Sequence, residues 1–428
     1  MYNLKNESKN IKVLLTIITL LFFTICLVSI FAYGNGTLLG DLQNPNNDDV
    51  KFIRSAQILA ETGVYTYHRP PNPTVFMMPG LPYTLALFIL IFGKLNAALT
   101  AFRIFQAVLL TLCLLLTFLI GKKIFSSKVG IIAVLLNALY IPEVWISNLI
   151  LTEALFKFFV LNLIYLSLFA IEEKKMFYYI LGGISWGIAT LYRPTIATFP
   201  IVILIMWIIK RYSFTDILKY TITVSLVLCA ILSPWWIRNY KTFNEFIPLT
   251  KATGNPMLQG TYIHYNQSSR QTDGLDYSQF KYPAETEFEN NDVEIAISKY
   301  RLKNLVPKNP LGFLYWYTIG KTFIQIGTVF FWNTFLGIHP AFAYIYHYFI
   351  LLCAFFGMKH YFKDKQKNIM GLAIFGAIIY FIVVYLPFYV FSRYFYPAMP
   401  LVMIFAGVHI VKWLEGSKFQ RFYNFIAN

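Results

Sequence analysis

Long uncharged stretches dominate the pattern of hydrophobic and polar positions along the chain. Most of them approach the roughly 20 residues that an α-helix needs to cross a bilayer. We predict membrane spans, the first of them a retained helix rather than a cleaved signal peptide, at 13–40, 103–121, 129–145, 150–171, 176–192, 194–210, 217–236, 339–358, 368–390 and 395–412. The pattern therefore predicts an all-α polytopic membrane protein with about 10–13 transmembrane helices.

Two other apolar stretches are harder to place across a bilayer. The segment 81–93 has 13 residues, which at about 1.5 Å per residue reach only about 20 Å of the roughly 30 Å hydrocarbon core. We expect this segment to lie along the outer leaflet or to dip into it, although pairing with another short crossing would also preserve the topology. The pattern leaves the disposition of the stretch 311–335 open.

The composition agrees with a membrane protein and excludes an ordinary soluble domain. Hydrophobic residues make up 57% of the 428 residues and charged residues only 13%, against roughly 25% charged residues in soluble domains. All four cysteines fall inside apolar windows without paired spacing. The sequence therefore indicates neither a disulfide framework nor a zinc site.

The distribution of charge predicts which side of the membrane each connection faces. The net charge of +16 could suggest nucleic acid as a partner, but Lys and Arg accumulate in short cytoplasmic connections of membrane proteins. We assign to the cytoplasm the segments 1–13, 121–128, 172–175, 210–219, 359–367 and 412–421, which together hold 18 basic and 6 acidic residues. The polar stretch 239–310 holds 8 of each and is assigned to the outside.

This topology predicts a plasma-membrane protein with both termini in the cytoplasm and no nucleic-acid partner. An N-terminal transmembrane module, 1–238, contains a first outer loop at 34–79. An extracytoplasmic region, 239–310, precedes a C-terminal transmembrane module, 311–428.

Charged residues at the ends of the predicted spans all fall on the outer side. They are Asp48, Asp49, Glu143, Glu153, Arg193, Arg238 and Arg393. Each has a plain structural interpretation: arginines at helix ends reach toward lipid headgroups, and an aspartate can cap a helix. Glu153 lies a few residues inside an apolar span, where an ionised carboxylate is costly and usually functional, unless Lys157 one turn later pairs with it.

A sugar carried on a lipid phosphate is a substrate that would use such a set. Arginine offers bidentate contacts to phosphate oxygens, and a carboxylate can remove the proton from the acceptor nucleophile as the bond to the sugar breaks. The guanidinium groups would stabilise the charge on the departing lipid phosphate. On this interpretation one residue of the pair Asp48 and Asp49 is a base.

The order of several motifs also resembles a known family. The motifs are "NDDVKFIRSAQILAETGVYTY", "PTVFMMPGLPYTLALFILIFG", "NLILTEALF", "LYRPT", "PWWIRNYKTFNEFIPLT" and "RYFYPAMPLVMIFAG". Together they resemble bacterial glycosyltransferases of the dolichyl-phosphate-mannose protein mannosyltransferase-like type. These belong to the GT-C superfamily, which includes lipid A aminoarabinose transferases, and the similarity runs from about residue 10 to about residue 415.

The resemblance implies roles for individual residues. It implies that Asp48 is the catalytic base and that Asp49 positions the acceptor or a metal ion. The second acid is often Glu in the family, and the following aromatic, here Phe52, is often Tyr. Glu153 is implied to support the acceptor site. Phosphate contacts are implied for Arg193, Arg238 and Arg393, with Trp235 and Tyr394 beside them at the headgroup level.

These observations together predict an inverting membrane glycosyltransferase with a cavity at the outer face. The donor would be a polyprenyl-phosphate sugar and the acceptor an extracytoplasmic protein, lipid or cell-envelope glycan. A lipid-linked oligosaccharide flippase and a polysaccharide ligase are the alternatives. No cofactor is required by the sequence, although a divalent metal is possible.

The outer region 239–310 carries a prediction of its own. Its last third, 291–306, has partial helical periodicity. We expect the region to pack over the outer cavity and to help select the acceptor, the alternative being an inert spacer.

Overall fold

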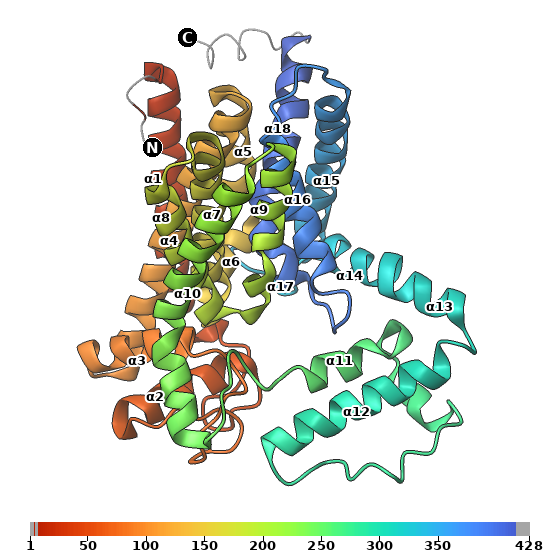
Figure 1. The fold of residues 1–428 in the computed structure, drawn as a ribbon. Coiled ribbons are helices and arrows are strands. Elements are labelled where there is room, and N and C mark those ends of the chain that lie inside the picture. Colours follow the sequence, from red (N-terminus) through yellow and green to blue (C-terminus); the bar gives the residue numbers. More distant parts are fainter. Residues whose placement is uncertain (1–3, 5–6, 417–428) are drawn as a thin grey trace.

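The computed structural model describes residue 4 and residues 7–416, and helices form almost all of its regular structure (Figure 1). The α-helices are α1 (Lys9–Tyr33), α2 (Asp48–Thr62), α3 (Gly80–Phe92), α4 (Leu95–Ile124), α5 (Ser127–Ala138), α6 (Ile141–Asn148), α7 (Glu153–Glu173), α8 (Met176–Tyr192), α9 (Pro200–Ile209), α10 (Phe214–Phe243), α11 (Gly254–Gly260), α12 (Glu287–Leu305), α13 (Pro310–Tyr315), α14 (Lys321–Gly327), α15 (Pro340–Lys363), α16 (Gly371–Val383), α17 (Ser392–Phe395) and α18 (Met399–Glu415). Short helical turns join several of them, among them η2 (Pro194–Thr198), η5 (Trp316–Gly320) and η6 (Tyr396–Ala398). Within the described residues there is no strand, so the predicted all-α class is confirmed.

Six stretches among the described residues are long and apolar enough to cross a membrane: α1, α4, α7, α10, α15 and the stretch that contains α17 and α18. The predicted multi-pass membrane protein is thus confirmed. The number is smaller than the 10–13 crossings expected, because the predicted spans 176–192, 194–210 and 368–390 form the shorter helices α8, α9 and α16.

The predicted span 129–145 forms two helices instead of one. The helices α5 and α6 are bent by 57° relative to each other, and together they give a seventh candidate crossing. Pro142 lies in the first turn of α6, where its missing N–H costs no hydrogen bond, whereas inside a continuous helix it would. The proline therefore starts a new helix in the middle of the apolar stretch.

The apolar segment 81–93 forms α3, which packs against α2 at one end of the bundle and lies across the direction of the long helices (Figure 1). This orientation agrees with the expected placement along one leaflet. The stretch 311–335, whose disposition was open, forms α13, η5 and α14 in succession.

Close packing between helices fixes the bundle. A side-chain Cβ added at Gly357 in α15 would overlap the carbonyl oxygen of Phe405 in α18. Small residues allow this approach in membrane proteins, where helices associate mainly through van der Waals packing. This contact holds α18 against α15, and α17, which carries Arg393, comes shortly before α18 in the chain.

The basic connections assigned to the cytoplasm lie together at one end of the bundle. Lys123 Nζ lies 2.5 Å from Glu172 Oε2, and Lys174 Nζ lies 3.1 Å from Asp216 Oδ2. The side chain of Asn368 also donates a hydrogen bond of 3.1 Å to the carbonyl of Ile124. The start of α1 and the end of α18 lie at this same end (Figure 1). The predicted C-terminal basic residues beyond 416 lie outside the described residues.

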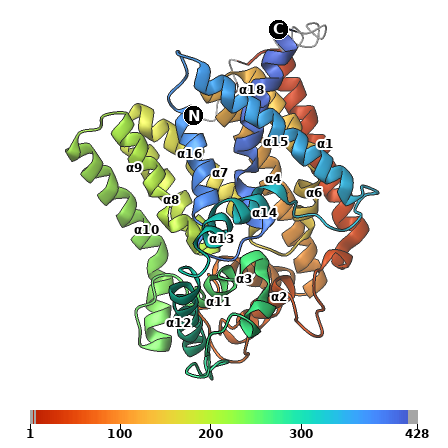
Figure 2. The ribbon, with the colours of Figure 1, turned by 90° about the vertical axis from the view of Figure 1, so that its right-hand side faces the viewer.

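The opposite end, called here the cavity end, carries the loop 34–79 and the region 239–310. In two views the helices α11 and α12 form a small lobe beside this end of the bundle (Figures 1 and 2). The predicted helix 291–306 is confirmed as α12, which begins four residues earlier than expected. Its early start is explained by a capping box, in which Thr286 and Glu289 each satisfy a backbone N–H of the other.

Candidate active site

A cavity of about 640 Å³ opens at the cavity end. Its walls come from the start of α2, the start of α7, the segment between α8 and η2, the segment before α17, and the α11–α12 lobe. Segments from both transmembrane modules and from the region between them therefore meet at one hollow. Of the predicted site residues, Asp48, Glu153, Arg193, Arg393 and Tyr394 line it.

Four of these residues form a chain of alternating charge. Arg393 Nη2 donates to Asp48 Oδ2 over 2.8 Å, and Arg393 Nε lies 3.9 Å from Glu153 Oε1. Arg193 Nη2 forms a short ion pair with the same oxygen of Glu153. The order along the chain is thus Asp48, Arg393, Glu153, Arg193, with two positive and two negative groups. All four are mostly or completely shielded from solvent, so their interactions are stronger than those of exposed ion pairs.

Asp48 occupies the first position of α2. The side chain of Asn47 caps the helix by accepting the backbone N–H of Asp48 over 2.8 Å. Tyr67 donates its hydroxyl to Asp48 Oδ1 over 3.0 Å, so both carboxylate oxygens have a partner. Burial alone would raise the pKa of this carboxyl, but the charge and hydrogen bond of Arg393 and the hydroxyl of Tyr67 outweigh it and lower the pKa below its usual value. Asp48 is therefore an ionised carboxylate at neutral pH.

Asp49, the other half of the pair, points away from the cavity. It is completely buried and accepts the backbone N–H of Leu39 over 2.5 Å and that of Val50 over 2.8 Å. Burial raises the pKa of Asp49, although the backbone N–H groups of Leu39, Val50 and Gly40 offset part of that rise. The expected contact of Asp49 with an acceptor or a metal ion finds no support in this geometry, because successive side chains of a helix point in different directions.

Arg193 reaches the cavity because of the proline that follows it. Residues before proline avoid the helical conformation, and Arg193 ends α8 in an extended conformation with φ of −144° and ψ of 122°. Its Nε donates to the hydroxyl of Thr152 over 2.9 Å. The motif "LYRPT" thus directs a guanidinium group toward the start of α7, where Glu153 lies.

Two guanidinium N–H groups at the cavity are buried without a hydrogen-bond partner among the described residues. They are Nη1 of Arg193 and Nε of Arg393. A buried donor without a partner is costly and calls for an explanation. An oxyanion bound in the cavity would provide acceptors for both.

Arg238 and Trp235 do not line the cavity. Arg238 donates to the backbone carbonyl of Thr74 over 2.7 Å and to that of Tyr65 over 3.3 Å. Its guanidinium lies 5.3 Å from the centre of the Trp235 ring, and the indole N–H of Trp235 bonds to the carbonyl of Leu249. Arg238 therefore attaches the loop before α3 to α10, and Trp235 attaches the segment that follows α10, which differs from the phosphate contact that the resemblance implied.

Lys157 does not pair with Glu153. It forms a short ion pair with Glu143 of α6, and Tyr396 also donates its hydroxyl to this carboxylate. Glu143 and Lys157 are both almost completely buried and lie away from the cavity lining. The sequence-based pairing of Lys157 was wrong because helix packing brought a carboxylate from a neighbouring helix closer.

Several residues at or beside the cavity were not predicted from the sequence. Tyr385 stacks on Tyr394 with ring centres 4.7 Å apart, and its hydroxyl lies 2.9 Å from that of Thr195. Tyr67, the partner of Asp48, was also missed, as was the polar face of α12 formed by Glu287, Asn290, Asn291 and Glu294. Only the last set carried a sequence signal, because its members recur at intervals of three and four residues.

The donor groups of the site do not suit a divalent cation as they are arranged. Asp48 is paired with Arg393 and Tyr67, and Asp49 faces backbone N–H groups. No group of three or more His, Cys, Asp or Glu residues close enough to hold a metal ion occurs in the described ranges.

Comparisons with known proteins agree with the fold. Residues 71–237, less than half of the chain, match the family model described as dolichyl-phosphate-mannose-protein mannosyltransferase. Glu153 and Arg193 lie inside this segment, whereas Asp48 and Arg393 lie outside it. A sequence search found no significant match among curated proteins.

The structure is similar to that of the archaeal oligosaccharyltransferase AglB from Archaeoglobus fulgidus. In complex with an inhibitory peptide and a dolichol-phosphate, AglB superimposes with a TM-score of 0.52 at 13% identity, over 94% of this chain and 51% of its own. In the apo form, AglB superimposes with a TM-score of 0.53 at 12% identity, over 95% of this chain and 51% of its own. ArnT from Cupriavidus metallidurans, bound to undecaprenyl phosphate, gives a TM-score of 0.44 at 11% identity, over 93% of this chain and 79% of its own.

The chain spans about half the length of the archaeal enzyme that it matches. The predicted resemblance to mannosyltransferase-like membrane proteins is confirmed by the family match over residues 71–237, and the chain shares the all-α membrane fold of the archaeal oligosaccharyltransferase.

Proposed function

We propose that this chain is a glycosyltransferase that moves a sugar from a polyprenyl-phosphate donor to an acceptor hydroxyl in the cavity. The observation that carries the proposal is the chain of Asp48, Arg393, Glu153 and Arg193, in which two buried guanidinium N–H groups make no hydrogen bond with the described residues. This arrangement offers a base and an oxyanion site within one hollow.

The proposed reaction is a single displacement. Asp48 takes the proton of the acceptor hydroxyl, and the acceptor oxygen forms a bond to the anomeric carbon of the sugar. The bond between that carbon and the donor phosphate breaks, and its electron pair leaves with the lipid phosphate. One displacement of this kind inverts the configuration at the anomeric carbon.

The charges of the site suit this course. The bound donor is a phosphodiester, and the departing lipid phosphate gains a negative charge as the bond breaks. Arg193 and Arg393 would stabilise that charge more in the transition state than in the ground state, which is the requirement for acceleration. The lowered pKa of Asp48 makes it a weak base, so proton transfer would follow the weakening of the sugar–phosphate bond.

The proposed orientation places the cavity on the extracytoplasmic side of the plasma membrane. The clustered basic connections at the opposite end support it, because such connections favour the cytoplasm. The donor would therefore be translocated before it is used.

Membranes that contain the wild-type chain can be incubated with a panel of radiolabelled polyprenyl-phosphate sugars. We expect transfer of label from at least one donor, and a loss of about 10²-fold to 10⁴-fold in Asp48→Asn, the usual contribution of a general base. Asp41→Asn is the matched control, since Asp41 is an exposed residue of the same loop. Equal transfer by wild type and Asp48→Asn would contradict the proposed base.

A further inference from the structure

The α12 helix presents one polar face to the cavity. Glu287, Asn290, Asn291 and Glu294 all line it, and their spacing places them on a single side of the helix. Glu294 is only 4% exposed, so this face is a wall of the cavity and not a solvated surface. Asp48 and the two arginines belong to other walls of the same hollow.

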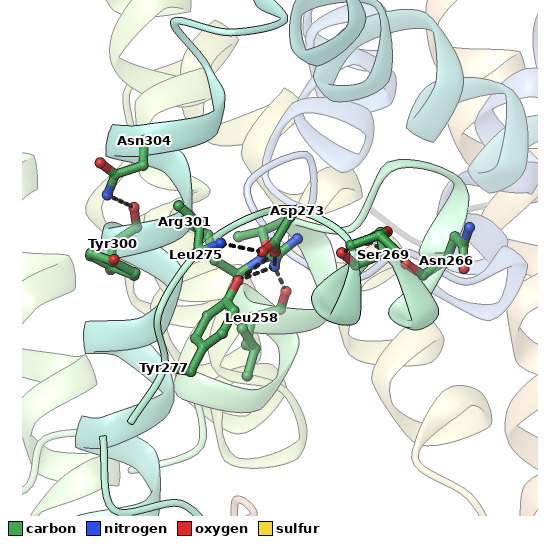
Figure 3. A network of polar contacts seen from close by, with 11 residues as sticks. Leu258, Asn266, Ser269, Asp273, Leu275, Tyr277, Tyr300, Arg301 and Asn304 are labelled. Carbon is green, nitrogen blue, oxygen red and sulfur yellow. Dashed lines mark hydrogen bonds and ion pairs between the residues drawn. The ribbon is translucent and has the colours of Figure 1, made fainter. Parts of the chain in front are cut away.

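This wall is held rigidly by the rest of the lobe. Arg301, on the same helix, donates to Asp273 Oδ2 over 2.5 Å and to the hydroxyl of Thr261 over 2.8 Å (Figure 3). The hydroxyl of Tyr277 lies in the same network, 2.6 Å from Asp273. Because Arg301 and Asp273 are almost completely buried, the network fixes α12 against the loop that follows α11.

Hydrogen bonds within the wall fix its side chains but leave acceptor atoms free. Glu294 Oε1 accepts from Asn255 over 3.1 Å and from Tyr282 over 3.0 Å, whereas its Oε2 makes no hydrogen bond with the described residues. Thr74 donates to Glu287 Oε2 over 2.7 Å, and Glu287 Oε1 is buried and accepts no hydrogen bond from the part of the chain that the structure describes. Each carboxylate is thus oriented by one oxygen and keeps the other, Oε2 of Glu294 and Oε1 of Glu287, without a hydrogen bond among the described residues.

The groups beside these oxygens indicate which kind of ligand would supply the hydrogen-bond donors. The amide Oδ1 of Asn290 accepts the backbone N–H of Ala284 over 2.9 Å, which leaves its NH₂ group as a donor. The aromatic rings of Phe76 and Phe388 line the same cavity. Carboxylate acceptors, a carboxamide donor and apolar ring faces are complementary to hydroxyl groups on a compact apolar frame. Two carboxylates also repel anions.

We infer that the polar face of α12 binds the acceptor, and that the acceptor is an uncharged saccharide whose hydroxyl groups donate to Glu287 and Glu294. This inference rests on the proposed glycosyl transfer for its biological meaning. The evidence for the binding site is the geometry of the α12 wall, so saccharide binding can be tested without the polyprenyl-phosphate sugar. The hydroxyl that reacts would be the one that faces Asp48.

The test is saturation-transfer NMR on the full chain in lipid nanodiscs. The probes are neutral oligosaccharides of glucose, galactose and N-acetylglucosamine, the same oligosaccharides carrying uronic acid groups, and an uncharged peptide rich in serine and threonine. We expect the neutral oligosaccharides to bind and the acidic ones to bind at least tenfold more weakly. Preferential binding of the peptide would overturn the inference.

Substitutions in α12 test whether the saccharide binds at its polar face. Glu294→Gln keeps an oxygen for Asn255 and Tyr282 but turns the free acceptor into a donor, and Glu287→Gln removes the second charge. Each should weaken saccharide binding about tenfold or more, since a lost hydrogen bond to a charged group has that size. The matched control is Glu285→Gln, because the Glu285 side chain is 76% exposed and does not line the cavity.

Binding of undecaprenyl phosphate, measured in parallel, separates the two proposals and checks folding. If the lipid binds equally to all variants while Glu294→Gln and Glu287→Gln lose the saccharide, the acceptor wall is supported. Unchanged saccharide binding in both variants would overturn it, even if sugar transfer by the wild type is observed. Saccharide binding without any transfer would count against the proposed function and not against the wall.

Discussion

Arg393 Nη2 lies 2.8 Å from Asp48 Oδ2, although 345 positions separate the two residues in the chain. The contact joins the start of α2 to α17, and so links the two predicted transmembrane modules at the cavity. Because Arg393 also approaches Glu153, one guanidinium group connects three segments of the chain at the site.

The two neighbouring aspartates should respond differently to the same substitution. Asp49→Asn removes a charged acceptor from the backbone N–H groups of Leu39 and Val50, which should cost about 1–3 kcal/mol of folding stability. Thermal unfolding of the purified chain would measure this loss. Transfer per folded molecule should stay within a few-fold of wild type, and a complete loss in folded Asp49→Asn would contradict the assignment of the base to Asp48.

Substitutions of Arg393 and Arg238 should have different effects on the affinity for lipid phosphate. Arg393→Gln removes a charged donor from the cavity, so the affinity for undecaprenyl phosphate should fall about tenfold to hundredfold. Arg238→Gln should leave this affinity unchanged and lower the unfolding temperature, since Arg238 holds the carbonyls of Thr74 and Tyr65. Fluorescence titration with the lipid would measure both. An equal loss of affinity in the two variants would reject the distinction.

The buried pair of Glu143 and Lys157 should show strong coupling in a double-mutant cycle. Lys157→Met leaves an uncompensated carboxylate in the bundle and should destabilise the protein by about 3–5 kcal/mol, with Glu143→Gln costing a comparable amount. The double variant should recover a large part of the loss. Additive losses in thermal unfolding would mean that the two groups do not interact.

Protonation of Asp48 should occur only at very low pH. The carboxyl of Asp48 has a lowered pKa in the folded protein, so its ion pair with Arg393 contributes stability that is fully present above the usual aspartate pKa of about 3.9. That stability is lost as the pH falls through the lowered value. The acid limb of the transfer rate should therefore lie below about pH 4 and move upward in Arg393→Gln. A limb that stays in place in this variant would contradict the role of Arg393.

His68, which lines the cavity, should also lower stability as the pH falls, but over a higher range of pH than Asp48. The side chain of His68 is exposed, but loss of hydration beside the rings of Tyr67 and Phe76, with the charge of Lys51 as a further cause, lowers its pKa to about 4. The imidazole is then neutral in the folded chain while the unfolded chain is protonated below about pH 6.5. Stability should fall as the pH decreases from 6.5 toward 4, and His68→Asn should flatten this part of the curve of unfolding temperature against pH. A curve identical to that of wild type would refute the shift.

The sequence by itself determined the class of protein and much of its chemistry. Uncharged stretches of about 20 residues can be stable only as helices within a bilayer, because every backbone polar group must be satisfied internally. The same local logic located the helix start at Asp48, the helix end at Arg193 before Pro194, and the helix within 291–306. Those signals depend on a few residues that are neighbours in the chain, so the amino-acid sequence alone contains them.

Only the tertiary structure decided which charged groups share the cavity. Asp48 and Asp49 are equivalent by sequence, but the packing of α2 buries one and presents the other. Arg238 and Arg393 both follow aromatic-rich span ends, and Lys157 is spaced to meet Glu153, yet backbone carbonyls hold Arg238 and Glu143 holds Lys157. Ion pairs form between groups that helix packing brings within a few ångströms, and such distances depend on contacts between residues far apart in the chain.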